Sequence, residues 1–468
     1  MELYSNYRGL EKGACSTVII GKNAAREHRI LIGHNEDDRD TVTQLHYVPR
    51  RVHPKGEMIV FEDGTAVIPQ AKETLAFFWS EARCPGGISF ADSFINECGV
   101  CIVSDSCRPS RDAHAVDGDN RKDYALGYAL RRITAERAHS AREAVRIAAE
   151  LIETYGYCSS RTYHFADAEE AWFLAVPKGF RCAAQRIQDD EIYFIPNHFQ
   201  IHAVHFDDPD NFYASPDVIS FAREQGWFTG RDEEFDFAEA YQQKPDEEHN
   251  TLRAMDAWKI LTGDELSPED VRIPVRRAGR LYDAEDVKRV LRSHGEGERD
   301  ITHGGTASPR LIDDVQTIHN ALTVESMICV TAPDPAETLL YYSARANDIC
   351  PYIPLFPLAV KDALPDAAFT SAEESLQDHF SFDPAWPEAD TLWNTAAALR
   401  QRIDSDYARL APLMRSHLQA MESRLNGITA DTLQKYAEQK DLRELSACSA
   451  QNFTDTRLRL KELYRNIA

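Results

Sequence analysis

The sequence predicts an α+β protein in which strands and helices form separate layers. Apolar, β-branched segments dominate the first hundred residues, helical patterns follow over residues 121–156, strand patterns then return, and the tail from about residue 385 is helical. Segregated runs of strands and helices are typical of this class. The chain has 468 residues, 43% of them hydrophobic, which is enough for a large core and exceeds one ordinary domain.

The first predicted elements are two strands joined by a short turn. Cys15–Lys22 and Arg29–His34 are rich in β-branched residues, and Asn23–His28 would form the turn between them. Another strand is predicted at Val100–Asp105, which follows the turn-like Asn96–Gly99.

Helices are predicted over residues 121–156. Ser140 and Glu143 have the spacing of a capping box, and Gly156 is a suitable residue to end a helix. Further strands are then predicted at Arg161–Phe165, Ala171–Val176, Glu191–Ile195, Ser326–Thr331 and Thr338–Ser343.

Residues 231–250 interrupt this pattern. Eight of their side chains are acidic and few are apolar, which predicts a solvated insertion or linker. In the tail, apolar residues recur every three or four positions from Leu392 to Leu425. We expect Pro412 to kink or divide this helix, and Gly427 to end it.

The composition limits the classes of partner. The net charge is −24, which argues against nucleic acid and anionic membranes and favours a small-molecule or peptide substrate. Residues 1–14 lack the apolar stretch of a secretory signal, and no run of about 18 apolar residues predicts a membrane span. With ten cysteines at low density, we expect a cytoplasmic protein with reduced thiols.

Cys15 is the first candidate for chemistry. It follows the small residues Gly13 and Ala14 and would open a strand. If the Ala14–Cys15 bond were cut, the new α-amine, with an ordinary pKa of roughly 7.7–8.0, would be a base on the same residue as the thiol. By itself, a cysteine at this position is more often a buried apolar side chain.

Several motifs, in order along the chain, resemble peptidase family C69, the dipeptidase A group. The resemblance covers residues 15–225 well and 315–360 less fully. It is carried by Cys15 with Gly33–Asp38 (GHNEDD), Asn96–Val100 (NECGV), Phe165–Leu174 (FADAEEAWFL), Ile195–Asn197 (IPN), Phe206–Phe212 (FDDPDNF) and Thr323–Ser326 (TVES).

This resemblance implies a four-layer αββα N-terminal-nucleophile (Ntn) hydrolase fold and amide hydrolysis through a thioester on Cys15. Bile salt hydrolases, penicillin V hydrolases and secernins belong to the same clan. Asp37 matches the aspartate that contacts the amine of the nucleophile. Asn197 matches the asparagine whose side-chain N–H faces the oxyanion.

The sequence also departs from these relatives. His34 stands where the acylamide hydrolases place arginine, which would make the site less electropositive or its activity more dependent on pH. Their asparagine on the next strand falls near Ser106, so a second oxyanion contact is not assured. Arg161 is a candidate to bind a substrate carboxylate, and a surface salt bridge is the alternative.

Other motifs predict no metal or cofactor. Cys98 and Cys101 form a lone CxxC with Cys107 nearby, which we interpret as buried structural thiols. His198, His202 and His205 would share one face only on a helix, and the neighbouring Pro196 favours extended chain. The glycines have no nucleotide-binding spacing.

The sequence thus predicts a cysteine dipeptidase with a leader at 1–14, a catalytic domain at 15–360 with an acidic insertion at about 231–300, and a helical region at 361–468. An N-acyl amide hydrolase or acyltransferase, and a non-catalytic secernin-like protein, are the alternatives. The sequence leaves a homo-oligomer open.

Overall fold

The computed structural model describes most of the chain after the first 14 residues. The described residues are 15–38, 41–61, 66–83, 93–107, 111, 126–127, 129–242, 248–295, 302, 304, 306–308, 317–320, 322–361, 364, 367–378 and 390–467. The predicted leader at 1–14 lies outside them.

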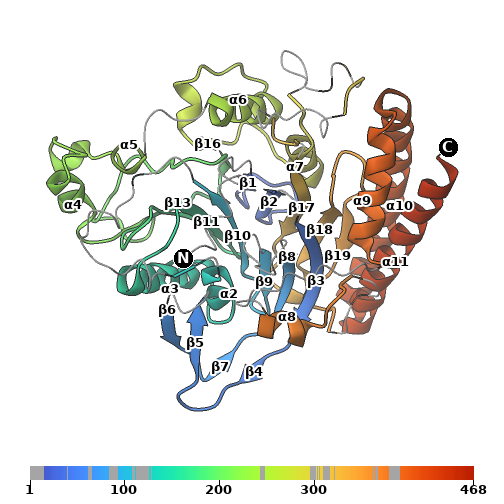
Figure 1. Cartoon of the computed structure of the whole chain (residues 1–468), viewed down its shortest axis with the longest axis horizontal. Helices are drawn as coiled ribbons and strands as arrows, with labels where there is room; N and C mark the ends of the chain where they lie inside the picture. The colour runs from blue at the N-terminus through green and yellow to red at the C-terminus, as the bar shows by residue number, and fades with distance from the viewer. Residues whose placement is uncertain are drawn as a thin grey trace.

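Two antiparallel sheets form the centre of the protein (Figure 1). The seven-stranded sheet has the order β16-β14-β1-β2-β17-β18-β19, with strands at Val275–Arg277, Glu191–Ile195, Ser16–Ile20, Leu31–Asp37, Thr323–Val330, Leu339–Ala344 and Ile353–Leu355. The eight-stranded sheet has the order β15-β13-β12-β11-β10-β9-β8-β3, with strands at Phe212–Ala214, Ala183–Ile187, Ala171–Val176, Arg161–Ala166, Cys101–Ser106, Ser93–Asn96, Phe77–Arg83 and Val42–Val48.

Two short hairpins complete the described strands. They pair β4 with β7 and β5 with β6, at Arg51–Val52, Glu73–Thr74, Met58–Phe61 and Ala66–Pro69. The strands predicted at Ala171–Val176 and Glu191–Ile195 have the predicted bounds, and the first hairpin is formed by β1 and β2.

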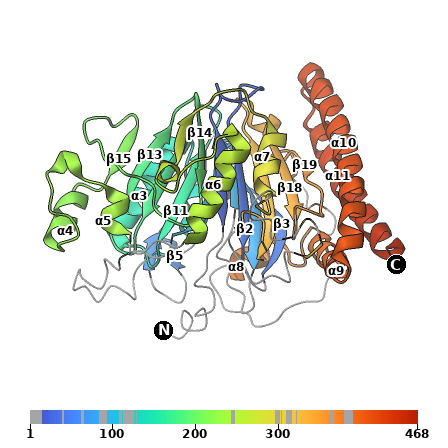
Figure 2. The same cartoon turned by 90° about the horizontal axis from the view of Figure 1, so that it is seen from above.

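Helices cover the outer face of each sheet (Figure 2). The eight-stranded sheet contacts α2 (Leu130–Ala135) and α3 (Ala141–Tyr155), whereas the seven-stranded sheet contacts α6 (Glu248–Thr262) and α7 (Ala284–Leu291). One apolar core lies between the sheets, and one lies under each helical layer. The predicted α+β class and its four-layer αββα arrangement are therefore confirmed.

The capping of α3 differs in one detail from the prediction. Ser140 accepts a hydrogen bond from the Glu143 N–H, as predicted, but the Glu143 carboxylate accepts from the His139 N–H instead of returning to Ser140. The helix therefore has a serine N-cap without the reciprocal half of a capping box. Gly156 follows its last residue with a φ of 76°, which glycine adopts readily.

The segment 231–250 is more ordered than a solvated linker. It contains the 3₁₀ turn η3 (Asp232–Glu234) and the helix α5 (Phe237–Tyr241), and it reaches the start of α6. Phe237 and Tyr241 are fully buried and stack on each other, with ring centroids 4.8 Å apart. Two buried aromatic residues thus anchor α5 despite the acidic composition, and the described part of the segment is partly helical. That the segment is an insertion stays a prediction.

Three long helices pack on the edge of the sheets that carries β19, β18 and β3 (Figure 1). They are α9 (Leu392–Asp404), α10 (Tyr407–Gln439) and α11 (Leu442–Asn466). The prediction that Pro412 would divide this helix and that Gly427 would end it was wrong. The helical run is interrupted at Ser405–Asp406, between α9 and α10, and α10 continues through both Pro412 and Gly427. The remaining described helices are α4 (Val218–Glu224), α8 (Ala372–Asp378) and the 3₁₀ turns η4 (Asp270–Arg272) and η6 (Pro335–Glu337).

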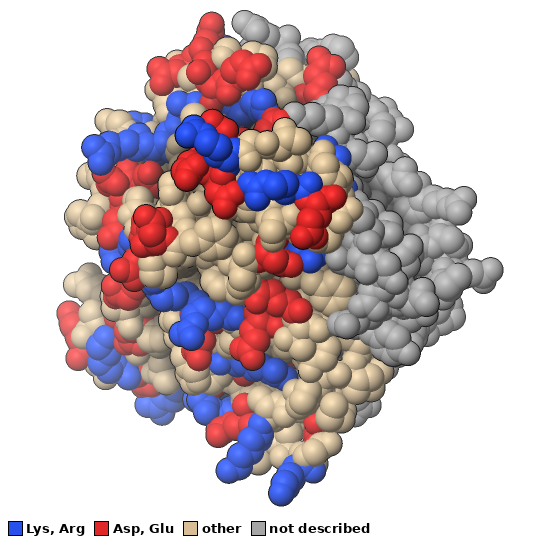
Figure 3. Space-filling view, turned by 90° about the vertical axis from the view of Figure 1, so that its left-hand side faces the viewer, with Lys and Arg blue, Asp and Glu red and all other residues tan. Residues whose placement is uncertain are grey.

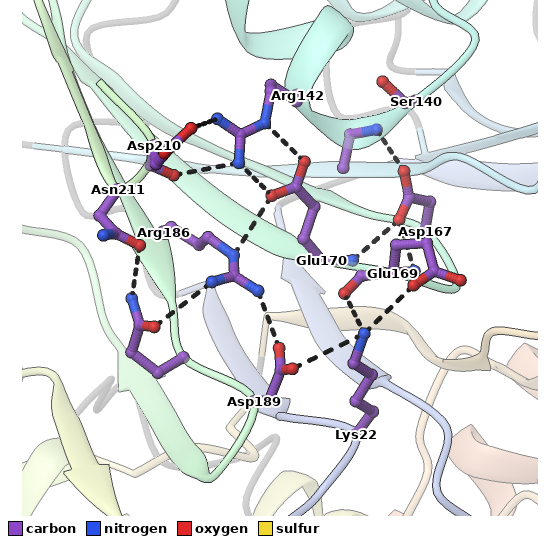
Figure 4. A network of polar contacts seen from close by, with 12 residues as sticks. Lys22, Ser140, Arg142, Asp167, Glu169, Glu170, Arg186, Asp189, Asp210 and Asn211 are labelled. Carbon is purple, nitrogen blue, oxygen red and sulfur yellow. Dashed lines mark hydrogen bonds and ion pairs between the residues drawn. The ribbon is translucent and has the colours of Figure 1, made fainter. Parts of the chain in front are cut away.

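A network of ion pairs connects the two sheets near the C-terminal end of β1 (Figure 4). Lys22, just after β1, contacts Glu169 at 3.2 Å and Asp189 at 3.6 Å. Arg186 on β13 contacts Asp189 at 2.9 Å and Glu170 at 3.2 Å. Because Asp189 lies in the turn that joins β13 of one sheet to β14 of the other, the network closes this end of the sandwich.

Charges of both signs are interspersed on the face drawn in Figure 3, where basic side chains are bordered by acidic ones. None of the helices in the described part of the chain is long and apolar enough to cross a membrane.

Candidate functional site

Cys15 lies at the start of β1, beside the central strand β2 of the seven-stranded sheet. Its side chain is buried, with 3% of the residue exposed. The Sγ atom lies 3.3 Å from Glu36 Oε1 and 4.0 Å from the backbone oxygen of Asp37. The candidate nucleophile is therefore surrounded by acceptors and by negative charge.

This environment keeps the thiol protonated. Burial raises the pKa of Cys15 well above its ordinary value, and the carboxylates of Glu36, Asp105 and Asp37 raise it further. In the full-length chain the nitrogen of Cys15 belongs to a peptide bond and offers no compensating positive charge. A thiolate at this position therefore requires a base or a nearby cation that offsets this negative charge.

Asp37, the last residue of β2, is buried beside the start of β17. Its Oδ2 accepts a hydrogen bond of 3.0 Å from Asn320 Nδ2, whereas its Oδ1 has no hydrogen-bond partner among the described residues. Burial raises the pKa of Asp37 to about 7, against the opposing effects of Thr323 and Arg253. An unsatisfied buried acceptor is costly, so Oδ1 is suited to a donor that arrives later.

Asn197 lies two residues after β14 and bridges to the other sheet. Its Nδ2 donates to the backbone oxygen of Ser106 at 2.8 Å and lies 3.3 Å from Ser106 Oγ, while its Oδ1 accepts from Arg253 Nη2 at 2.7 Å. Because arginine can only donate, this contact fixes the orientation of the amide and turns its N–H groups towards β10. Ser106, predicted to lie near the site, therefore lies next to Asn197.

Arg253 is a site residue that the sequence did not reveal. It is fully buried on α6, and its Nη1 donates to the backbone oxygen of Cys15 at 2.9 Å. Its Nη2 is shared between Asn197 and Asn250, each at 2.7 Å. One guanidinium thus connects the backbone of the candidate nucleophile to the candidate oxyanion donor.

A second unpredicted residue, Glu36, connects Cys15 to a polar chain between the sheets. Glu36 Oε2 lies 3.3 Å from His34 Nε2, and His34 Nδ1 lies 2.9 Å from Thr17 Oγ1. Thr17 donates to Asp105 on β10 at 2.6 Å. His34 and Glu36 are two residues apart on one strand and share a face, which strand alternation in the sequence could have indicated.

The charge of His34 differs from the expectation for a neutral histidine. Burial alone would lower its pKa, but the carboxylates of Glu36, Asp105 and Glu325 outweigh that effect and raise the pKa of His34 above its ordinary value. The site therefore favours the charged form of His34 more than water does.

Arg161 is buried on β11, opposite Ser106 in the strand register. Its Nη1 donates to Ser104 Oγ at 3.0 Å. Arg161 is thus not at the surface, where the alternative of a salt bridge placed it, and it lies next to the strand that contacts Asn197. Its contact with a substrate carboxylate stays a prediction.

The cysteines of the CxxC motif and Cys107 have different surroundings. Cys101 is buried and interacts with Cys329 of the opposite sheet, and Cys107 is buried 3.1 Å from Thr162 Oγ1. Cys98 is only half-buried and lies 3.5 Å from His139 Nδ1. The prediction of buried structural thiols holds for Cys101 and Cys107 and was wrong for Cys98, which lies in the turn before β10.

The three histidines of the HFQIHAVH segment have different partners. His198 contacts Gln200 at 2.6 Å, His202 contacts Asp236 at 2.8 Å, and His205 packs against the ring of Phe212. The segment is neither helix nor strand, so the histidines do not share a helical face.

The arrangement as a whole has the parts of an acyl-transfer site. A thiol, a carboxyl group with a pKa of about 7 and an oriented amide donor meet at the ends of β1, β2 and β14. Such a site needs a nucleophile, a carboxyl group that can hold a basic amine in place and a donor for the oxyanion, and these three groups correspond to those roles.

Comparisons with known proteins agree with this geometry. The chain is 24% identical to a "Probable dipeptidase" of Latilactobacillus sakei over 365 residues, which are 74% of this chain and 75% of that protein. It is 23% identical to a "Probable dipeptidase A" of Streptococcus pyogenes serotype M1 over 391 residues, which are 79% and 80% of the two chains. The family model of peptidase family C69 matches residues 14–382. The chain therefore belongs to peptidase family C69, and its fold is the one that this resemblance implied.

Proposed function

We propose that this peptidase is a cysteine dipeptidase of the Ntn type, which removes residues 1–14 itself and then uses Cys15 as its nucleophile. The observation that carries the proposal is the pairing of a buried thiol with a buried carboxyl group whose Oδ1 has no partner among the described residues. A free α-amine on Cys15 would supply both the missing base and a donor for Asp37.

In the first half of the reaction, the α-amine accepts the thiol proton, and Sγ attacks the carbonyl carbon of the substrate. The carbonyl oxygen becomes an oxyanion that the side-chain N–H of Asn197 stabilises, in place of one of its contacts with Ser106. The C–N bond then breaks, the protonated amine of Cys15 returns the proton to the leaving amine, and a thioester remains on Cys15.

In the second half, water attacks the thioester carbonyl while the amine accepts a proton from it. The C–S bond breaks, the amine returns its proton to the Cys15 sulfur, and the product leaves as a carboxylic acid. Arg253 acts as a positioning residue in both halves, because it holds the Cys15 backbone and the Asn197 amide in one arrangement. Small peptides are the proposed substrates, since the named relatives are probable dipeptidases.

The decisive test combines intact mass, N-terminal sequencing and turnover. We expect purified protein to begin at Cys15 and to hydrolyse dipeptides, whereas Cys15→Ala should keep residues 1–14 and show no turnover. Cys158→Ala removes another thiol that is not fully buried and serves as the control, with processing and turnover unchanged. An active Cys15→Ala variant would exclude the proposal.

The substrate panel should include N-acyl amino acids beside dipeptides. Cleavage of acylated amines without any cleavage of dipeptides would identify an acylamide hydrolase of the same clan. A chain that keeps its leader and fails to react at Cys15 with a thiol-directed electrophile would instead match the non-catalytic alternative.

A reducing compartment fits the proposed chemistry. All nine cysteines of the described residues are free thiols, and a thiol nucleophile must stay reduced to act. We therefore propose the cytoplasm as the site of action, which fractionation of cells that produce the protein would test.

A further inference from the structure

A group of metal-ligating side chains outside the Cys15 site lies where three connecting segments meet. His294 follows α7, His319 precedes β17 and Asp348 follows β18. Their ligand atoms all lie within 4.8 Å of one another, and no more than 4% of any of the three residues is exposed. Two imidazoles and a carboxylate are a common donor set for zinc.

Each imidazole lies at a zinc-like distance from one of the two oxygens of the Asp348 carboxylate. Asp348 lies between the imidazoles, with Oδ2 3.4 Å from His294 Nε2 and Oδ1 3.2 Å from His319 Nε2. Ligand atoms of a tetrahedral zinc site are about 3.3 Å apart, given bonds of about 2.0–2.1 Å. The two rings are nearly perpendicular, at 85°, with centroids 4.7 Å apart, so they approach from different directions.

The His319 ring has an unused nitrogen. His319 Nδ1 is a buried donor or acceptor without a hydrogen-bond partner among the described residues.

An outer shell holds the carboxylate in place. Arg400 Nη1 donates to Asp348 Oδ1 at 2.7 Å, and the Tyr407 hydroxyl donates to Oδ2 at 3.1 Å. Arg400 is itself paired with Asp404 at 2.8 Å, which offsets its charge. Ligating carboxylates are normally hydrogen-bonded in this way by groups that do not touch the metal.

A route from outside exists. A pocket of about 480 Å³ is lined by His294 and Asp348 together with Thr302, Arg415 and others. This leaves room for a water molecule as a further ligand and for entry of the ion.

We propose that His294, His319 and Asp348 bind one divalent transition-metal ion, with zinc favoured by the donor set, as a structural site behind the active-site strand. Two of the proposed ligands are adjacent in the chain to residues that contact β2. Asn320, which follows His319, donates to Asp37 at 3.0 Å, and Asn347, which precedes Asp348, contacts Asn35 of β2 at 3.3 Å. An ion at this position would fix the two segments that support β2.

The test uses the full-length protein after treatment with a chelator. Zinc is titrated against a chromophoric chelator, and the zinc content after gel filtration is measured by mass spectrometry. We expect one equivalent in the wild type and its loss in His319→Gln. His202→Gln changes another histidine paired with an aspartate and should still bind one equivalent. Tyr407→Phe should weaken binding by about 10-fold or more through the outer shell.

Cobalt(II) distinguishes this site from the thiols, including Cys15. The proposal requires a visible d–d spectrum without a thiolate-to-cobalt charge-transfer band. It is overturned if the wild type retains no zinc, if His319→Gln retains a full equivalent, or if the charge-transfer band appears. Because every readout concerns the metal, failure of this proposal would leave the dipeptidase assignment untouched.

Discussion

Glu36 lies between the thiol of Cys15 and the imidazole of His34, at 3.3 Å from each. It is one of the carboxylates that raise the pKa of Cys15, and it also raises the pKa of His34. Its charge therefore favours the protonated form of each neighbour, which makes the thiol less reactive.

Glu36→Gln tests this role, because it removes the charge and keeps the size. We expect the pKa of the Cys15 thiol to fall, so that alkylation of Cys15 at pH 7 becomes several-fold faster. The rate is measured for the Cys15 peptide by mass spectrometry as a function of pH. Glu97→Gln, remote from Cys15, is the control, and an unchanged pH profile in Glu36→Gln would contradict the electrostatic argument.

Arg253→Lys tests the positioning role of the guanidinium. Lysine keeps the charge but cannot reach Cys15, Asn197 and Asn250 together as a planar fork does. We expect kcat to fall by about 10²-fold as the oxyanion donor loses its orientation, with a smaller change in KM. Arg272→Lys, on the surface, should match the wild type, and a variant that loses only substrate affinity would refute this role.

The candidate site residues that belong to sequence motifs could be predicted from the sequence. Those that reach the site only through folding of a distant segment could not. Cys15, Asp37 and Asn197 stand in motifs of the family. In the structure, the backbone oxygen of Asp37 lies 4.0 Å from the Cys15 thiol, and Asn197 is connected to the Cys15 backbone through Arg253. Arg253 is 238 residues from Cys15 and belongs to a stretch that the sequence suggested was an insertion. No local pattern can report a contact that arises only when α6 packs on the sheet.

At the scale of elements, Gly427 shows how packing outweighs propensity. The glycine was expected to end the helix, yet α10 continues for another three turns because residues on both sides of it, Leu425 and Tyr436 among them, are buried against the neighbouring elements. Pro412 likewise lies in the second turn of α10, where it removes one intrahelical hydrogen bond without ending the helix. Propensity is a weak guide wherever a helix has a long apolar face.

Gly427→Ala should therefore stabilise the protein. A Cβ at this position meets no atom within 4 Å, and glycine within a helix costs roughly 1 kcal/mol relative to alanine. We expect the free energy of unfolding to rise by about 0.5–1 kcal/mol in chemical denaturation. Gly56→Ala is the matched control, because it also has open space but a φ of +84°, and it should lose about 1–2 kcal/mol. Equal effects of both changes would show that backbone conformation does not decide the result.

At the scale of the whole molecule, Asp37 couples stability to pH. Burial raises its pKa from the ordinary 3.8 to about 7 in the folded, uncut chain. The folded state then binds more protons than the unfolded state between about pH 4 and pH 7, so stability falls as the pH rises through this window. The full loss, at most on the order of 4 kcal/mol, is present above pH 7.

This dependence can be measured in the Cys15→Ala background, which should retain its leader. We expect Asp37→Asn to raise the free energy of unfolding more at pH 8, where Asp37 is ionised, than at pH 5. Urea unfolding at both pH values measures this difference. Asp210→Asn changes an exposed carboxyl group and should leave the pH dependence as it was. A parallel response of both variants would show that Asp37 is not the group responsible.

If Cys15 removes the first 14 residues as proposed, the contribution of Arg253 to its site makes completion of the fold a condition for that cleavage. The helix that carries it is translated more than two hundred residues after the thiol, so an emerging or truncated chain holds a cysteine without the arginine that orients its backbone. Under the proposed mechanism, such a chain would keep its leader. The presence or absence of the first 14 residues would then be a record, readable on every molecule, of whether that molecule had finished folding.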